Sequence, residues 1–183
     1  MNATALSQHR LVGDFLSAND YETQSASATI EELDKYKSTW HTQSLERGEP
    51  IIRVVIGNGR PHWLFEAVEK LNALLQLSSN WDSYGAAPVR SSAVKDALSV
   101  LIKSLDTDSP NPIIVPTSVG GLQTEWHLKG IDFEIDFPGS GACNLYAEDS
   151  AGAFPDQEIE NASIDEPRLI ESIREIMDKI SRR

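Results

Sequence analysis

The sequence contains one cysteine, Cys143, among its 183 residues. A disulfide needs two cysteines and a cysteine-based zinc site needs several, so neither can hold this chain together. A chain of this length can do without them, because folding buries roughly 70% of the surface that its unfolded form exposes. Such sparing use of cysteine is typical of a reducing compartment, and we therefore expect a cytoplasmic protein.

Long apolar runs are missing as well. No stretch approaches the ~20 apolar residues that cross a bilayer, and the first residues, MNATALSQHRLVGDFL, lack the basic start and long apolar core of a signal peptide. We expect no membrane contact.

Basic residues are outnumbered, since 16 Lys and Arg stand against 28 Asp and Glu and the formal net charge is −12. Proteins that bind nucleic acid directly cluster Lys and Arg to neutralise phosphates, so this balance argues against direct nucleic-acid binding. An acidic surface instead attracts a basic protein partner. We expect no cofactor, and the sequence leaves the oligomeric state open.

The chain divides into two regions by composition. Residues 1–50 combine weak helical patterns, at 11–16 and 30–40, with a polar stretch, and we interpret them as an N-terminal arm that is partly helical or flexible. Residues 51–183 are predicted to form a single α+β domain, which begins with a β-branched strand at 51–56.

Apolar residues in the domain recur with the spacing of helices in some segments and with the spacing of strands in others. Helices are predicted where apolar residues recur every three or four positions, at 63–77, 92–105 and 167–180. Strands are predicted from alternating or β-branched segments at 112–116, 121–128, 131–137 and 142–146. The acidic residues between 148 and 165 are predicted to form a solvated connection or lid. We therefore expect an α+β fold in which an antiparallel β-meander of about four strands packs against two or three helices.

The segment GGLQTEWHLKGIDFEID is predicted to form a hairpin around a two-residue turn, Lys129-Gly130. This turn sets Glu125 opposite Glu134 and His127 opposite Asp132. It also gathers the apolar residues on one face: Leu122, Trp126, Leu128, Ile131, Phe133, Ile135 and Phe137. The candidate binding residues then share the polar face: Gln123, Glu125, His127, Asp132, Glu134 and Asp136.

Two opposed carboxylates, such as Glu125 and Glu134, repel each other unless water, a cation or a shared proton compensates. Three interpretations of the polar face stay open. The face is solvated and His127 pairs with Asp132, or the face receives a basic partner. In the third, Glu125, His127 and Glu134 bind a divalent metal or act as acid and base.

A second candidate binding site is the loop NWDSYGAAP at residues 80–88. In one interpretation Asp82 and Tyr84 form a polar pair that lines a pocket. In the other, which we favour, Trp81 fills the core while Asn80 or Asp82 caps a turn, because loops rich in Asn, Asp, Ser and Gly usually satisfy their own backbone.

Two motifs, NWDSYGA at 80–86 and GGLQTEWH at 120–127, resemble those of an uncharacterised family of small bacterial proteins. In that family a Trp-Asp-x-Tyr-Gly-Ala loop precedes a Gly-Gly-x-Gln-x-Glu-Trp-His strand. The resemblance covers roughly residues 74–137, under half of the chain, and implies no activity. It singles out these residues for testing: Trp81, Asp82, Tyr84, Gly85, Gln123, Glu125, Trp126 and His127.

No set of nucleophile, base and orienting residue emerges, because the histidines are scattered and Cys143 has no neighbouring cue for a lowered pKa. We therefore expect a non-catalytic acidic module that binds another protein, for example by neutralising a basic toxin or effector. Two alternatives stay open: a metal-dependent enzyme that uses the polar face of the hairpin at 121–137, and an acidic mimic of nucleic acid.

Overall fold

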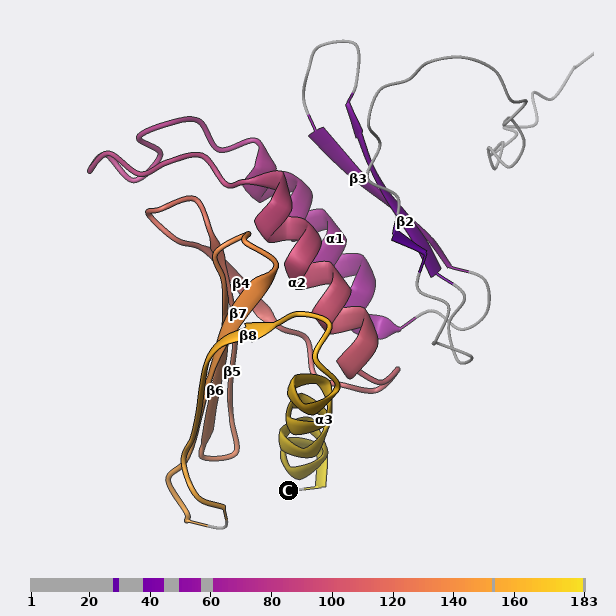
Figure 1. Cartoon of the computed structure of the whole chain (residues 1–183), viewed down its shortest axis with the longest axis vertical. Helices are drawn as coiled ribbons and strands as arrows, with labels where there is room; N and C mark the ends of the chain where they lie inside the picture. The colour runs from indigo at the N-terminus through magenta and orange to yellow at the C-terminus, as the bar shows by residue number, and fades with distance from the viewer. Residues whose placement is uncertain (1–27, 30–37, 45–49, 57–60, 153, 183) are drawn as a thin grey trace, which may run out of the picture.

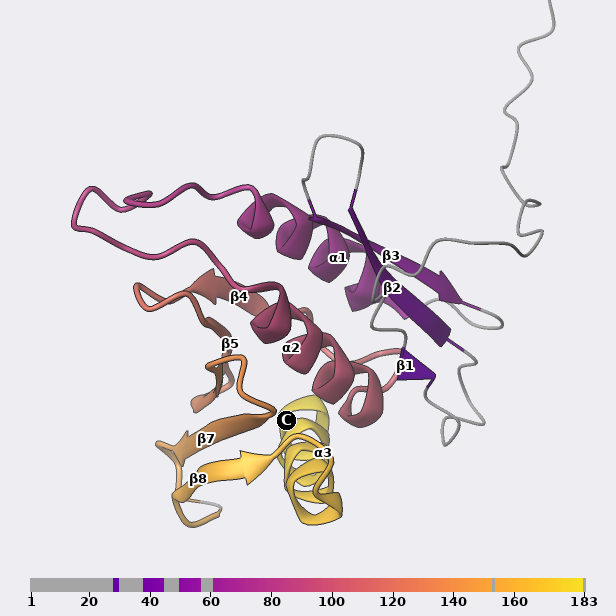
Figure 2. The same ribbon diagram turned by 45° about the horizontal axis from the view of Figure 1, so that its top comes forward.

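The computed structural model describes residues 28–29, 38–44, 50–56, 61–152 and 154–182. Figures 1 and 2 together label these elements, which are, in chain order: β1 (Ala28–Thr29), β2 (Ser38–Ser44), β3 (Pro50–Ile56), α1 (His62–Leu75), α2 (Ser91–Ser104), β4 (Ile113–Pro116), β5 (Leu122–Leu128), β6 (Ile131–Phe137), β7 (Ala142–Asp149), β8 (Gln157–Ser163) and α3 (Pro167–Arg182). The α+β class expected from the sequence is confirmed.

The main sheet is an antiparallel meander in which β4 to β8 lie side by side in chain order. Figures 1 and 2 show the helices on one face of this sheet and no described helix over the opposite face. A sheet covered on one side buries alternate residues of each strand, and β6 follows this pattern along its length.

The main sheet has five strands rather than the four predicted, because β8 forms within the segment interpreted as a solvated connection or lid. Ala162 is the one buried residue of β8, and Ile159 is partly buried against the core. An edge strand pairs on one side only and packs little apolar surface, so β8 carries a weak hydrophobic signal in the sequence. β7 also extends past its predicted end, to Asp149.

A second antiparallel sheet is formed by β1, β2 and β3. β2 pairs with β3 across the boundary predicted between residues 50 and 51. Residues 38–40, where the helical pattern predicted at 30–40 ends, belong to β2. The rest of that pattern and the pattern at 11–16 lie outside the described residues.

Helix α1 is hydrogen-bonded to β3. The Asn72 side chain of α1 accepts a hydrogen bond from Ile52 N at 2.7 Å and donates one to Ile52 O at 3.3 Å.

The core lies between the helices and the main sheet, and two of its tryptophans fix the loop that joins α2 to β4. Trp63 of α1 donates its indole N–H to Asp106 O at 2.9 Å, and Trp126 of β5 donates to Pro110 O at 3.0 Å. Both rings are almost fully buried. Because a buried N–H without a partner is costly, these two bonds tie the loop to both layers of the fold.

The segments that border the two motifs are hydrogen-bonded to each other. Ala87 N donates to Ser118 O at 2.8 Å, and Arg90 N donates to Gly120 O at 3.0 Å. The guanidinium of Arg90 also donates to Val119 O at 2.9 Å and to Pro138 O at 2.6 Å. Gly120 has a φ of +81°, and a Cβ added there would lie 2.7 Å from the carbonyl oxygen of Pro88. The close approach of the two loops therefore requires glycine at this position.

We expect the substitution Gly120→Ala to lower the free energy of unfolding by roughly 3 kcal/mol, because it adds a backbone overlap to the strain of a positive φ. Gly85→Ala is the matched control, since Gly85 has a φ of +95° but no neighbouring atom within 4 Å of an added Cβ. Its loss should be about 1 kcal/mol, from backbone strain alone. Urea denaturation of the two variants measures the difference, and equal losses would contradict the close packing at Gly120.

Candidate functional site

The candidate site is the face of the main sheet that the helices leave uncovered, which we call the outer face. Strand residues point alternately to the two faces, and the observed registers place these side chains on the outer one: Ile113, Val115, Gln123, Glu125, His127, Asp132, Glu134, Asp136, Asn144, Tyr146, Glu148 and Glu158. Half of these side chains are carboxylates, and none is Lys or Arg. The sequence-predicted residues of the hairpin therefore belong to a larger acidic surface.

The hairpin register predicted from the sequence is confirmed. Glu125 pairs with Glu134, and the turn residues Lys129 and Gly130 have φ values of 55° and 80°. On the core face, the rings of Trp126 and Phe133 stack with centroids 5.1 Å apart. The buried aromatic pair and the outer carboxylates are thus two consequences of one register.

One residue of the predicted apolar face departs from the expectation. Leu128 is 38% exposed, because it lies beside the turn at the end of the hairpin. The other residues assigned to that face are buried: Leu122, Trp126, Ile131, Phe133, Ile135 and Phe137.

The opposed carboxylates of Glu125 and Glu134 are each stabilised by a different neighbour on β5. Gln123 Nε2 donates a hydrogen bond to Glu134 Oε2 at 2.6 Å, and His127 Nε2 lies 3.2 Å from Glu125 Oε2. Asp136 Oδ2 accepts a further bond from Asn144 Nδ2 at 3.3 Å. Polar groups of the same face therefore offset the repulsion and keep the carboxylates oriented.

His127 bridges two carboxylates. Its Nδ1 lies 2.7 Å from Asp132 Oδ1, while its Nε2 faces Glu125. Hydrogen bonding to Asp132, and then to Glu125, raises the pKa of His127 above its ordinary value of 6.5. The raised pKa favours the protonated imidazole, so His127 can add a positive charge to an otherwise acidic face.

Tyr146 is a functional candidate that the sequence reasoning missed. It lies on β7 between Glu134 of β6 and Glu158 of β8, and it is 40% exposed. Its hydroxyl donates to Glu148 Oε2 at 2.7 Å, and this bond raises the pKa of Tyr146 to about 12. The alternation of Asn144, Tyr146 and Glu148 could have indicated the face, but their neighbours become evident only once β7 is paired on both sides.

The loop at 80–88 satisfies its own backbone, as the favoured interpretation predicted. Asp82 Oδ1 accepts hydrogen bonds from Tyr84 N at 2.8 Å and Ala86 N at 3.0 Å, and these bonds lower the pKa of Asp82. Asn80 Oδ1 accepts a third from Gly85 N at 2.7 Å. The expectation that Trp81 fills the core is wrong, because its ring is only partly buried and its Nε1 reaches the carbonyl oxygen of Ala87 at the loop.

Tyr84 projects from this loop with 93% of its surface exposed. Its backbone N–H donates to the carboxylate of Asp82, and neither residue lines the pocket between α2 and α3. Asp82 therefore shapes the loop, because its carboxylate is bonded to backbone N–H groups of the same loop.

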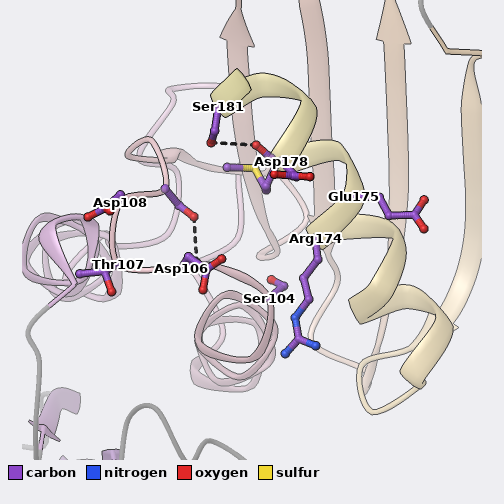
Figure 3. Close-up of a pocket in the computed structure, with 10 residues that line it drawn as sticks. Ser104, Asp106, Thr107, Asp108, Arg174, Glu175, Asp178 and Ser181 are labelled. Carbon is purple, nitrogen blue, oxygen red and sulfur yellow. Dashed lines mark hydrogen bonds between the residues drawn. The ribbon is translucent and has the colours of Figure 1, made fainter. Parts of the chain in front are cut away.

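A pocket of about 530 Å³ lies between the end of α2, the loop after it and α3 (Figure 3). It is lined by residues around 104–109 and 174–181, and none of the sequence-predicted site residues is among them. Three of its polar side chains are hydrogen-bonded within the fold: Ser109 Oγ accepts a bond from Asp106 N, Ser181 Oγ donates to Met177 O, and Arg174 donates to Lys103 O. We therefore place the candidate site on the outer face.

The geometry of the described residues does not favour a metal site or a reactive thiol. Among the residues that the structure describes, no group of three or more His, Cys, Asp or Glu side chains is placed to hold a metal ion. Cys143 is buried in the core, and burial raises the pKa of its thiol to about 12. A thiol in that environment stays protonated near neutral pH and is a poor nucleophile.

No family model, curated protein or solved structure matches this chain. In the part of the chain that the structure describes, no helix is both long enough and apolar enough to cross a bilayer.

We expect an NMR pH titration to place the pKa of His127 above 6.5. Asp132→Asn should lower this pKa more than Glu125→Gln does, because the contact with Asp132 is shorter, 2.7 Å against 3.2 Å. A raised histidine pKa stabilises the fold at low pH, and this contribution is lost as the pH rises through the folded-state pKa. A pKa that Asp132→Asn leaves unchanged would contradict the bridge.

Proposed function

We propose that this protein is a non-catalytic module that binds a basic protein through its outer face. The observation that carries the proposal is the outer face of the main sheet. This face carries six carboxylates and, on the strands that the structure describes, no Lys or Arg. Such a surface accelerates the encounter with a positively charged partner and disfavours acidic ones. The net charge of −12 acts in the same direction.

The role that fits this chemistry is neutralisation of a basic toxin or effector in the cytoplasm. The second motif supports a binding role of the outer face, because Gln123, Glu125 and His127 point to this face while Trp126 of the same motif is buried. The motif thus combines residues that build the sheet with residues that a partner can reach. The proposed role is compatible with the resemblance to the uncharacterised bacterial family, which implies no activity of its own.

The two alternatives have less support from the geometry. A mimic of nucleic acid needs two roughly parallel rows of carboxylates. β6 supplies one row, with Asp132, Glu134 and Asp136, but β5 and β7 each contribute a single carboxylate to the outer face, Glu125 and Glu148. A metal-dependent enzyme needs converging ligands, whereas Glu125 and Glu134 are hydrogen-bonded to different partners.

Affinity capture with the full chain tests the proposal. The triple variant Glu125→Gln, Asp132→Asn, Glu134→Gln removes three charges from the outer face. The wild type should retain a basic protein at about 0.05 M salt and release most of it at about 0.5 M, because salt screens exposed charges. The triple variant should bind that purified protein at least about tenfold more weakly.

The matched control removes three exposed carboxylates from helices α1 and α3 through Glu69→Gln, Glu171→Gln and Glu175→Gln. Its net charge equals that of the first variant, so retained binding by the control separates the outer face from net charge. Equal binding by both variants, or a partner unaffected by salt, would contradict the proposal.

A further inference from the structure

One row of residues crosses all five strands of the outer face. The registers set Ile113 beside Glu125, Glu125 beside Glu134, Glu134 beside Tyr146, and Tyr146 beside Glu158. Neighbours in such a row have Cβ atoms about 5 Å apart. Tyr146 therefore presents an aromatic ring between two carboxylates on an exposed surface.

The ring of Tyr146 is held in place as well as exposed. Its hydroxyl donates to Glu148 Oε2 at 2.7 Å, two positions along the same strand. The strand itself is paired on both sides, with β6 and β8. A ring on a paired strand with a bonded hydroxyl loses little conformational entropy when a partner contacts it, so its surface is preorganised for binding.

The chemistry of this arrangement distinguishes arginine from lysine. A guanidinium is planar, so it can lie over an aromatic ring and at the same time donate two parallel hydrogen bonds to a carboxylate. An ammonium is a compact, strongly hydrated charge that does not offer this planar pair of donors. In this row the ring of Tyr146 lies beside the carboxylates of Glu134 and Glu158. One guanidinium can therefore stack on the ring and donate hydrogen bonds to either carboxylate.

We propose that the outer face recognises an arginine of a basic protein partner, which lies over the ring of Tyr146 and donates to Glu134 or Glu158. This inference rests on the proposed function and specifies its partner. Charge complementarity selects a basic segment, and the exposed ring selects arginine within it.

Calorimetry with two synthetic peptides tests the inference, one carrying arginines and the other lysines at the same positions. We expect the wild type to bind the arginine peptide about threefold to tenfold more tightly than the lysine peptide at low salt. Tyr146→Leu should bring this ratio to about one while both peptides still bind. Tyr146→Phe should keep the preference, because it keeps the ring.

Phe65→Leu is the matched control, since Phe65 is an exposed aromatic of α1, 59% accessible, away from the outer face. It should leave the preference unchanged. An NMR measurement on the wild type provides a second test: the side-chain protons of the bound arginine should move upfield, because they lie over the ring, and the ring signals of Tyr146 should shift with them.

The outcomes separate the two proposals. Equal affinities of the wild type for both peptides, or an arginine preference that survives Tyr146→Leu, would overturn the arginine inference and leave acidic docking in place. Absence of binding by either peptide would contradict the proposed function as well.

Discussion

The register of the β5–β6 hairpin is the constraint on which the rest of the structure depends. The turn at Lys129 and Gly130 sets it, and the stacked pair of Trp126 and Phe133 locks it from the core side. A slip by one residue would turn these rings to water and bring the carboxylates of Glu125 and Glu134 into the core. The same alternation of side chains along β5 and β6 therefore determines both the core and the candidate site.

The same alternation explains how an acidic face can coexist with a stable sheet. Carboxylates on neighbouring strands would repel, but polar groups of the same face contact them. Gln123 donates to Glu134, His127 bridges Glu125 and Asp132, and Asn144 donates to Asp136. These contacts orient the carboxylates without cancelling their charge, since only His127 can become positive. The face therefore keeps the negative charge on which the proposed docking of a basic partner depends.

The hairpin could be predicted because local turn chemistry and long alternation agree on one register. β8 could not, because an edge strand with one buried residue, Ala162, has almost no hydrophobic period. The large ring of Trp81 favours a place in the core, whereas the hydrogen-bonded loop at 80–88 leaves the ring only partly buried. The sequence alone does not single out Tyr146 as a site residue. Its role in the candidate site depends on its neighbours Glu134 and Glu158, which are distant in sequence.

The most direct test of the central claim is a map of backbone amide shifts on titration with an arginine-containing peptide. The account predicts that the largest shifts fall on β5 to β8, around His127, Glu134 and Tyr146, with small changes on α1 and α3. Shifts concentrated at residues 104–109 and 174–181, which line the pocket beside α3, would show that the binding surface lies elsewhere and would contradict it.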